Sequence, residues 1–210
     1  MLNIRIVFTT LAMAMTVVAS LAAAIKFTST WKHIDAGTVS FAGKNVAALV
    51  ISKDDSLRIA GEESLVRELT SRGMQAVAAY RIAPKEELAQ PETAKAWFEK
   101  ANVEGVVAVR PVSVESQTYT SSTWVTPYYS TLWGYYGYGW STVYVPGGLS
   151  RTETRVVVET VIYSVPKNQL LWAAVTETTN ARDLPAFVQE LVKRSVEVLQ
   201  EQGLARRLPK

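Results

Sequence analysis

Two glutamates in the C-terminal half of the chain could act as the acid and base of a hydrolase. Glu159 and Glu177 lie in two segments rich in β-formers, 151–165 and 169–178, on either side of the turn sequence 166–168. Two such segments around a turn with Pro and Asn predict a β-hairpin. Paired carboxylates are the groups that glycoside hydrolysis uses, so one interpretation is an enzyme that acts on envelope glycans.

The register of this hairpin decides whether the carboxylates share a face. We expect Val165 to pair with Gln169. That register predicts three further pairs: Glu159 with Val175, Val157 with Glu177, and Arg155 with Thr179. These residues would all point to one face of the sheet. Because Arg155 then lies diagonal to Glu177, a solvated Arg–Glu cluster explains the pattern equally well, and we favour it.

Few other residues have the types that catalysis needs. Arg110 and Tyr163 would join the glutamates only in some strand orders. The single histidine, His33, lies two residues before Asp35 and could act as a base. With no Cys and no second His, a nucleophile system lacks its usual partners, so we interpret His33 as a polar residue after an edge strand. We predict a non-enzymatic protein with no catalytic residue, no metal and no cofactor.

Nucleotides and nucleic acids are poor candidates as ligands. Gly134, Gly137 and Gly139 lack the preceding strand and following helix that a phosphate-binding loop requires. The formal net charge is only +3, and no basic run exceeds Arg206-Arg207. A nucleic-acid-binding surface normally concentrates its positive charge, so we expect no nucleic-acid partner.

An uncharged aromatic insert spans Ser116 to Ser150 and holds ten of the twenty aromatic residues. Gly, Ser, Thr and Pro interrupt the rings, without a clean helical or strand period. Tyr and Trp favour protein hot spots, sugar-binding faces and membrane interfaces, so we predict contact with an envelope protein, a glycan or a membrane interface. The alternative is a long hairpin whose rings pack on their own sheet. The candidate binding residues are Trp124, Tyr128, Tyr129, Trp133, Tyr135, Tyr136, Tyr138 and Trp140.

The rest of the chain, 25–203, is predicted to form one α/β (α+β) domain. Apolar or alternating strands are expected at 27–32, 45–52, 75–82 and from 105, before the hairpin. Helices are expected after 54–56, after Pro84, after Pro91 and after Asp183. The order β-β-α-β-α-β-(insert)-β-β-α contains two strand–helix–strand units, which imply parallel neighbours. We therefore predict a single mixed β-sheet with helices packed on it; the oligomeric state stays open. Besides the hydrolase, a further alternative for the function is a structural scaffold that docks into an assembly by a sheet edge, at 27–32.

The first 24 residues form a separate unit. Arg5 precedes an apolar run, 6–18, and the small-residue stretch 19–24 follows. This is the pattern of a secretory signal peptide cleaved near Ala24, which predicts an exported protein in the periplasm or associated with the outer membrane. The alternative is an uncleaved anchor in the inner membrane. Residues 204–210 form a basic tail.

Several motifs resemble a group of uncharacterised bacterial cell-envelope lipoproteins. They are Phe27-Thr28-Ser29-Thr30-Trp31-Lys32, the stretch 44–51, the Trp-Gly-Tyr-Tyr-Gly-Tyr-Gly-Trp run, Leu170-Leu171-Trp172-Ala173 and Glu177-Thr178-Thr179-Asn180. The resemblance implies an envelope location and supplies no catalytic residues. Those lipoproteins carry an acylated Cys where this chain has Ala24. The order of elements is also similar to the TolB N-terminal domain, LpoB and CsgG, which is a likeness of fold alone.

Overall fold

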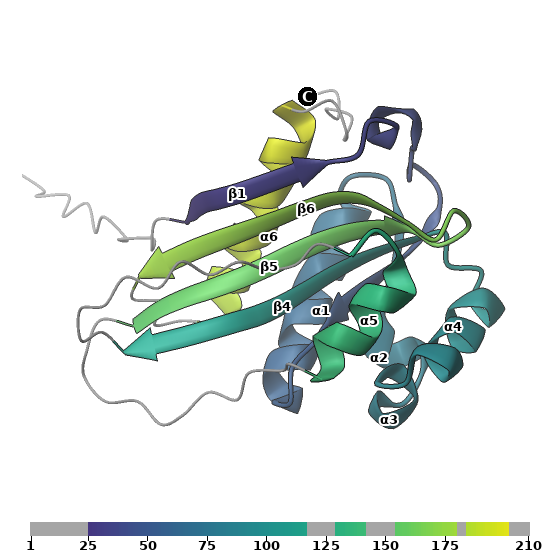
Figure 1. The fold of residues 1–210 in the computed structure, drawn as a ribbon, viewed down its shortest axis with the longest axis horizontal. Helices are drawn as coiled ribbons and strands as arrows, with labels where there is room; N and C mark the ends of the chain where they lie inside the picture. The colour runs from purple at the N-terminus through teal and green to yellow at the C-terminus, as the bar shows by residue number, and fades with distance from the viewer. Residues whose placement is uncertain (1–24, 117–128, 142–153, 180–183, 202–210) are drawn as a thin grey trace, which may run out of the picture.

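A six-stranded mixed sheet forms the centre of the computed structural model, which describes residues 25–116, 129–141, 154–179 and 184–201 (Figure 1). Its strands are β1 (Lys26–Lys32), β2 (Asn45–Val50), β3 (Gln75–Ala78), β4 (Gly105–Ser116), β5 (Thr154–Ser164) and β6 (Gln169–Thr179), in the spatial order β1-β6-β5-β4-β2-β3. β2 runs parallel to β3 and β4, and the other neighbours are antiparallel. The predicted fold class is confirmed. The predicted signal peptide and basic tail lie outside the described residues.

Helices cover both faces of the sheet (Figure 1). The first face carries α1 (Asp55–Thr70) and α6 (Leu184–Glu201). The second carries α2 (Ala79–Ile82), α3 (Lys85–Leu88), α4 (Pro91–Lys100) and α5 (Leu132–Ser141). A short 3₁₀ turn, η1 (Ala36–Thr38), follows β1. We call these the α1/α6 face and the α4/α5 face.

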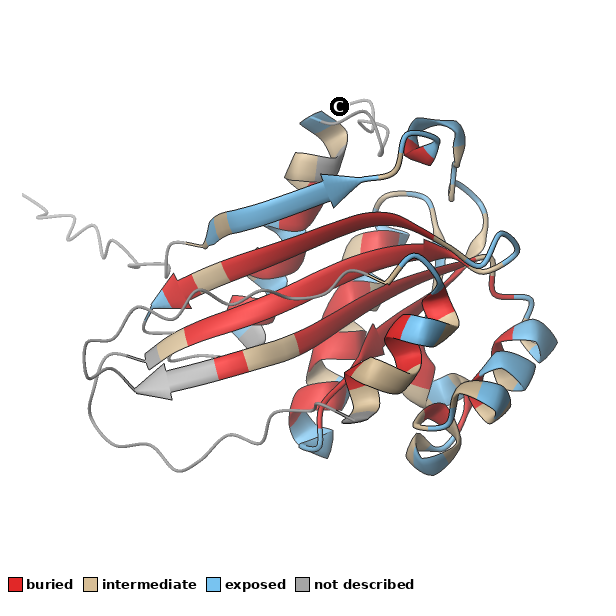
Figure 2. Ribbon diagram, in the orientation of Figure 1, coloured by how far each residue is buried: buried red, intermediate tan, exposed pale blue. Residues whose placement is uncertain are grey.

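The central strands are apolar on both sides because both faces are covered. In β2, Ala47 and Leu49 face the α4/α5 layer, whereas Val46, Ala48 and Val50 face the α1/α6 layer. Figure 2 shows this burial along β2, β4, β5 and β6, in contrast to the exposed β1. The sheet therefore separates two apolar cores.

Local signals in the sequence explain both ends of α1 and the buried face of α6. The Asp54 carboxylate accepts a hydrogen bond from the Leu57 N–H (3.1 Å) and caps α1, as predicted. Gly73 follows that helix with φ of +82°, a conformation that glycine adopts without strain. The predicted apolar stripe of α6 is buried at Phe187, Val188, Leu191, Val192, Ser195 and Val196.

The predicted strand 75–82 is too long. β3 ends at Ala78, and α2 begins at the next residue. The reason is Glu62 on α1, whose carboxylate accepts the backbone N–H of Val50 (3.2 Å) and of Tyr80 (2.8 Å). The Glu62 carboxylate, rather than a neighbouring strand, thus accepts backbone N–H groups at the carboxyl ends of β2 and β3.

The hairpin register is confirmed over most of its length. Arg155 pairs with Thr179, Val157 with Glu177, and Glu159 with Val175. At the turn the prediction is wrong, because Ser164, not Val165, pairs with Gln169. An irregularity between Ile162 and Tyr163 then restores the expected register, because Leu171 is an extra residue on β6, as in a β-bulge.

Candidate functional site

The centre of the aromatic insert forms the helix α5 rather than the irregular segment or hairpin expected from the sequence. Leu132, Tyr135 and Tyr136 are spaced three and four residues apart and point into the α4/α5 core. Gly139 permits a close approach, since a Cβ there would lie 2.8 Å from Ile51 Cδ1. The Asn168 side chain accepts the Leu132 N–H (3.1 Å) and so fixes the start of the helix to the hairpin turn.

The predicted binding residues are largely part of this core. Tyr135 and Tyr136 are 1% and 0% exposed. The half-buried ones pack against the same cluster: Tyr129, Trp133 and Trp140. The Tyr136 ring meets Phe98 edge-on at 6.1 Å. Trp124 and Tyr128 lie outside the described residues. The arrangement agrees with the alternative in which the rings pack on their own sheet, and binding by these residues stays a prediction.

A buried ion pair lies beneath α5. Arg110 on β4 is directly opposite Glu159 on β5, and its Nε and Nη2 donate to Glu159 Oε2 at 3.1 and 2.9 Å. The Tyr138 ring lies 4.9 Å from the guanidinium carbon. Burial raises the pKa of the Glu159 carboxyl, and Arg110 opposes that rise. The expected solvated cluster is therefore wrong at Glu159, which is fully buried.

Glu177 belongs to a second, separate ion pair. Its carboxylate binds Arg155 across β5 and β6, and these side chains are 24% and 20% exposed, respectively. This contact confirms the Arg–Glu interpretation at Glu177. Each glutamate thus has its own arginine, and Glu159 has no exposed surface through which to meet a substrate. Tyr163 shares their face but donates its hydroxyl to the Tyr129 carbonyl (3.0 Å).

The edge strand β1 is the most exposed strand of the sheet. Six of its seven residues are exposed, and within the described part of the chain it pairs only with β6. The His33 N–H bonds to the Leu171 carbonyl (2.9 Å). Because hydrogen-bonded and non-bonded pairs alternate in antiparallel sheets, Thr30 directs its N–H and C=O away from β6. At Thr30 the outer edge of β1 therefore offers a backbone donor and a backbone acceptor.

A hollow of about 230 Å³ lies where β1 ends, lined by Trp31, His33, Ser130, Gln169 and Leu170. We call it the Trp31 hollow. The Leu170 N–H bonds to the Ser130 carbonyl (3.0 Å), which positions the segment before α5 as one wall. Sequence reasoning missed this site because His33 and Gln169, which are in contact, are 136 positions apart. The exposed Trp31 in an edge strand was the available signal.

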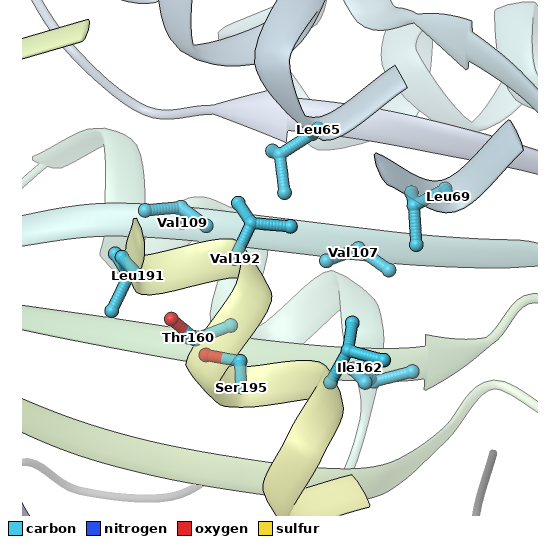
Figure 3. Close-up of a pocket in the computed structure, with 10 residues that line it drawn as sticks. Leu65, Leu69, Val107, Val109, Thr160, Ile162, Leu191, Val192 and Ser195 are labelled. Carbon is cyan, nitrogen blue, oxygen red and sulfur yellow. The ribbon is translucent and has the colours of Figure 1, made fainter. Parts of the chain in front are cut away.

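A second cavity, between the α1/α6 helices and the sheet, is much smaller (Figure 3). It holds about 20 Å³ and is lined by apolar side chains together with the hydroxyls of Thr160 and Ser195. This volume is enough for about one water molecule. The cavity is therefore a packing defect of the core rather than a ligand site.

The described residues contain no group of three or more His, Cys, Asp or Glu that could hold a metal ion. In the same part of the chain, no helix has the length and hydrophobicity needed to cross a membrane.

No protein-family model matches the chain, and no curated protein matches it in sequence. Among solved structures it is similar to PelC, a dodecamer from Paraburkholderia phytofirmans, at 16% identity and a TM-score of 0.46, covering 89% of this chain and 100% of that chain. It is also similar to lipoprotein GNA1162 from Neisseria meningitidis, at 11% identity and a TM-score of 0.39, over 76% of this chain and 96% of that chain. At TM-scores below 0.5, these likenesses carry no inference about function.

Proposed function

We propose that this chain is an exported, non-enzymatic cell-envelope protein that binds a protein partner along the outer edge of β1. The observation that carries the proposal is that β1 is an edge strand paired with β6 alone among the described strands, with six of its seven residues exposed, whereas β3 at the opposite edge has only four residues. An extended segment of a partner can add a strand to such an edge, with main-chain hydrogen bonds supplying the affinity. Export rests on the signal-like sequence of residues 1–24.

The charges of β1 favour a different protein over a second copy of this chain. Lys26 and Lys32 lie at the two ends of the strand. A second β1 pairing antiparallel about Ser29 would place Lys26 opposite Lys32, and like charges directly opposite are destabilising. A partner strand with an acidic residue opposite Lys26 would instead gain a favourable cross-strand pair.

The geometry gives less support to the hydrolase alternative. Glu159 is fully buried against Arg110, and Glu177 is paired with Arg155. A general acid or base must reach the proton that it transfers. Each carboxylate forms an ion pair with an arginine. The two glutamates therefore do not provide the two accessible carboxyl groups that glycoside hydrolysis needs.

A proline at Thr30 tests the proposal. Thr30 directs its N–H away from β6, so Thr30→Pro removes an outward donor and preserves the internal ladder. We expect the partner that co-purifies with the wild-type protein from native envelopes to bind Thr30→Pro at least about tenfold more weakly, which corresponds to about 1.4 kcal/mol. The matched control, Thr30→Val, keeps the N–H and should bind normally. Unchanged binding by a folded Thr30→Pro variant would overturn the proposal.

A further inference from the structure

We propose that the Trp31 hollow binds a neutral sugar ring. This inference does not depend on strand pairing at β1, because the hollow is built on the α4/α5 face of the sheet and not on its hydrogen-bonding edge. Its lining combines one exposed indole with side chains of His, Ser and Gln. An aromatic face beside a few polar groups suits a sugar, which presents an apolar ring face and a rim of hydroxyls.

Hydrogen bonds fix the chemistry of the two main polar groups. The Asp35 N–H donates to His33 Nδ1 (3.0 Å), so the neutral imidazole carries its proton on Nε2. His33 Nε2 lies 2.9 Å from Gln169 Nε2. Two N–H donors cannot bond to each other, so we assign Gln169 Oε1 to this position, as the hydrogen-bond network requires. In this orientation the amide hydrogens of Gln169 point away from His33 and can donate to a ligand oxygen.

Trp31 is the aromatic platform of the hollow. Its side chain is 37% exposed, which makes it one of the few large apolar side chains of the described residues that face solvent. The imidazole of His33 meets the indole edge-on, at 6.0 Å between centroids and 65° between planes. This contact holds the indole in place. A fixed aromatic ring loses little conformational entropy when a ligand stacks on it.

Size and charge narrow the ligand class. The volume of about 230 Å³ is below the usual range for drug-sized ligands and suits a single ring. Ser130 is one of the lining residues, and its hydroxyl is of a type that can both donate and accept. Among the described residues, no Lys, Arg, Asp or Glu lines the hollow. A phosphate or carboxylate ligand would therefore lack a counter-charge, whereas the hydroxyls of a neutral hexose or N-acetylhexosamine match these groups.

The test is an NMR titration of the full chain, as its host processes it, with methyl β-glucopyranoside and with di-N-acetylchitobiose. We expect saturable shifts of the Trp31 indole N–H and the Gln169 amide, with a dissociation constant on the order of 1 mM. Trp31→Ala should weaken binding at least about tenfold, and Trp31→Phe should retain part of it. Ile34→Ala is the matched control, because Ile34 is 90% exposed next to the site but does not line it.

Three results would overturn the proposal. The first is the absence of saturable shifts with either sugar. The second is unchanged affinity in a Trp31→Ala variant whose amide spectrum shows an intact sheet. The third is saturable shifts confined to Trp133 and Trp140 on α5, which would assign sugar binding to the insert. Loss of protein binding in Thr30→Pro with sugar binding retained would separate the two proposals.

Discussion

Arg110 and Glu159 are paired directly across β4 and β5, 2.9 Å apart at Nη2 and Oε2 and 1% and 0% exposed. Removing one partner of such a pair leaves a buried charge without compensation, which costs about 3–5 kcal/mol. We expect Glu159→Leu and Arg110→Met each to lower the unfolding free energy by about this amount. The double variant should lose much less than the sum of the single changes, as a urea denaturation cycle can measure. Additive losses would contradict the pairing.

Glu62 should make stability depend on pH near neutrality. Burial raises its pKa to about 7 from 4.5, despite the bonds from the Val50 and Tyr80 N–H groups. The folded state then holds a proton that the unfolded state releases above about pH 4.5, so this contribution is present at low pH and is lost as the pH rises through about 7. We expect a loss on the order of 3 kcal/mol between about pH 5 and pH 8.

Glu62→Gln provides the control for this pH effect. It cannot titrate, although its amide N–H₂ faces one backbone N–H and lowers stability at every pH. The measurement is therefore the slope of unfolding free energy against pH and not its absolute value. A wild-type slope equal to that of Glu62→Gln would show that the carboxylate is not the source.

Thr160 and Ser195 offer a stabilising substitution. Figure 3 shows both hydroxyls in the cavity between β5 and α6, and neither has a hydrogen-bond partner in the described residues. A buried unsatisfied hydroxyl costs about 1–3 kcal/mol. Thr160→Val keeps the side-chain volume, so we expect it to raise the unfolding free energy by about 1 kcal/mol. A decrease in thermal unfolding experiments would indicate that an ordered water already satisfies the hydroxyl.

The rings of α5 should matter for folding. Tyr136 is fully buried against Phe98, and Trp133 packs beside it with ring centroids 5.7 Å apart. Loss of a buried aromatic side chain costs about 3–5 kcal/mol, so Tyr136→Ala should destabilise the protein strongly. Replacing Trp133, Tyr136 and Trp140 together with Ser should unfold the α4/α5 core. Normal stability of the triple variant would contradict the packed position of α5.

The sequence predicted the sheet well because its signals are local. The Asp54 cap, the two strands on either side of the hairpin turn and the stripe of α6 depend on neighbouring residues, and they were correct. β3 was predicted too long because Glu62, from another element, ends it. Helix α5 was not predicted. Its glycines interrupt the apolar pattern, so the helical spacing of Leu132, Tyr135 and Tyr136, which pack on the sheet, was not recognised.

The candidate site was harder to predict, because it depends on tertiary contacts. The charge pattern of the sequence indicated a solvated Arg–Glu cluster, and it could not distinguish the fully buried Glu159 from the partly exposed Glu177. The Trp31 hollow requires the β1–β6 pairing and the Ser130 segment to be brought together. Neither contact leaves a local signature in the chain.

Photo-crosslinking in native cells tests the central claim most directly. A photoreactive residue at Thr30 reports on the edge of β1, and one at the exposed Ile59 on α1 is the matched control. We predict that Thr30 yields one discrete crosslinked protein and Ile59 does not, and that Thr30→Pro abolishes co-purification of that same protein. Crosslinks from positions in α5 but not from Thr30, or a complex unaffected by Thr30→Pro, would contradict binding through β1.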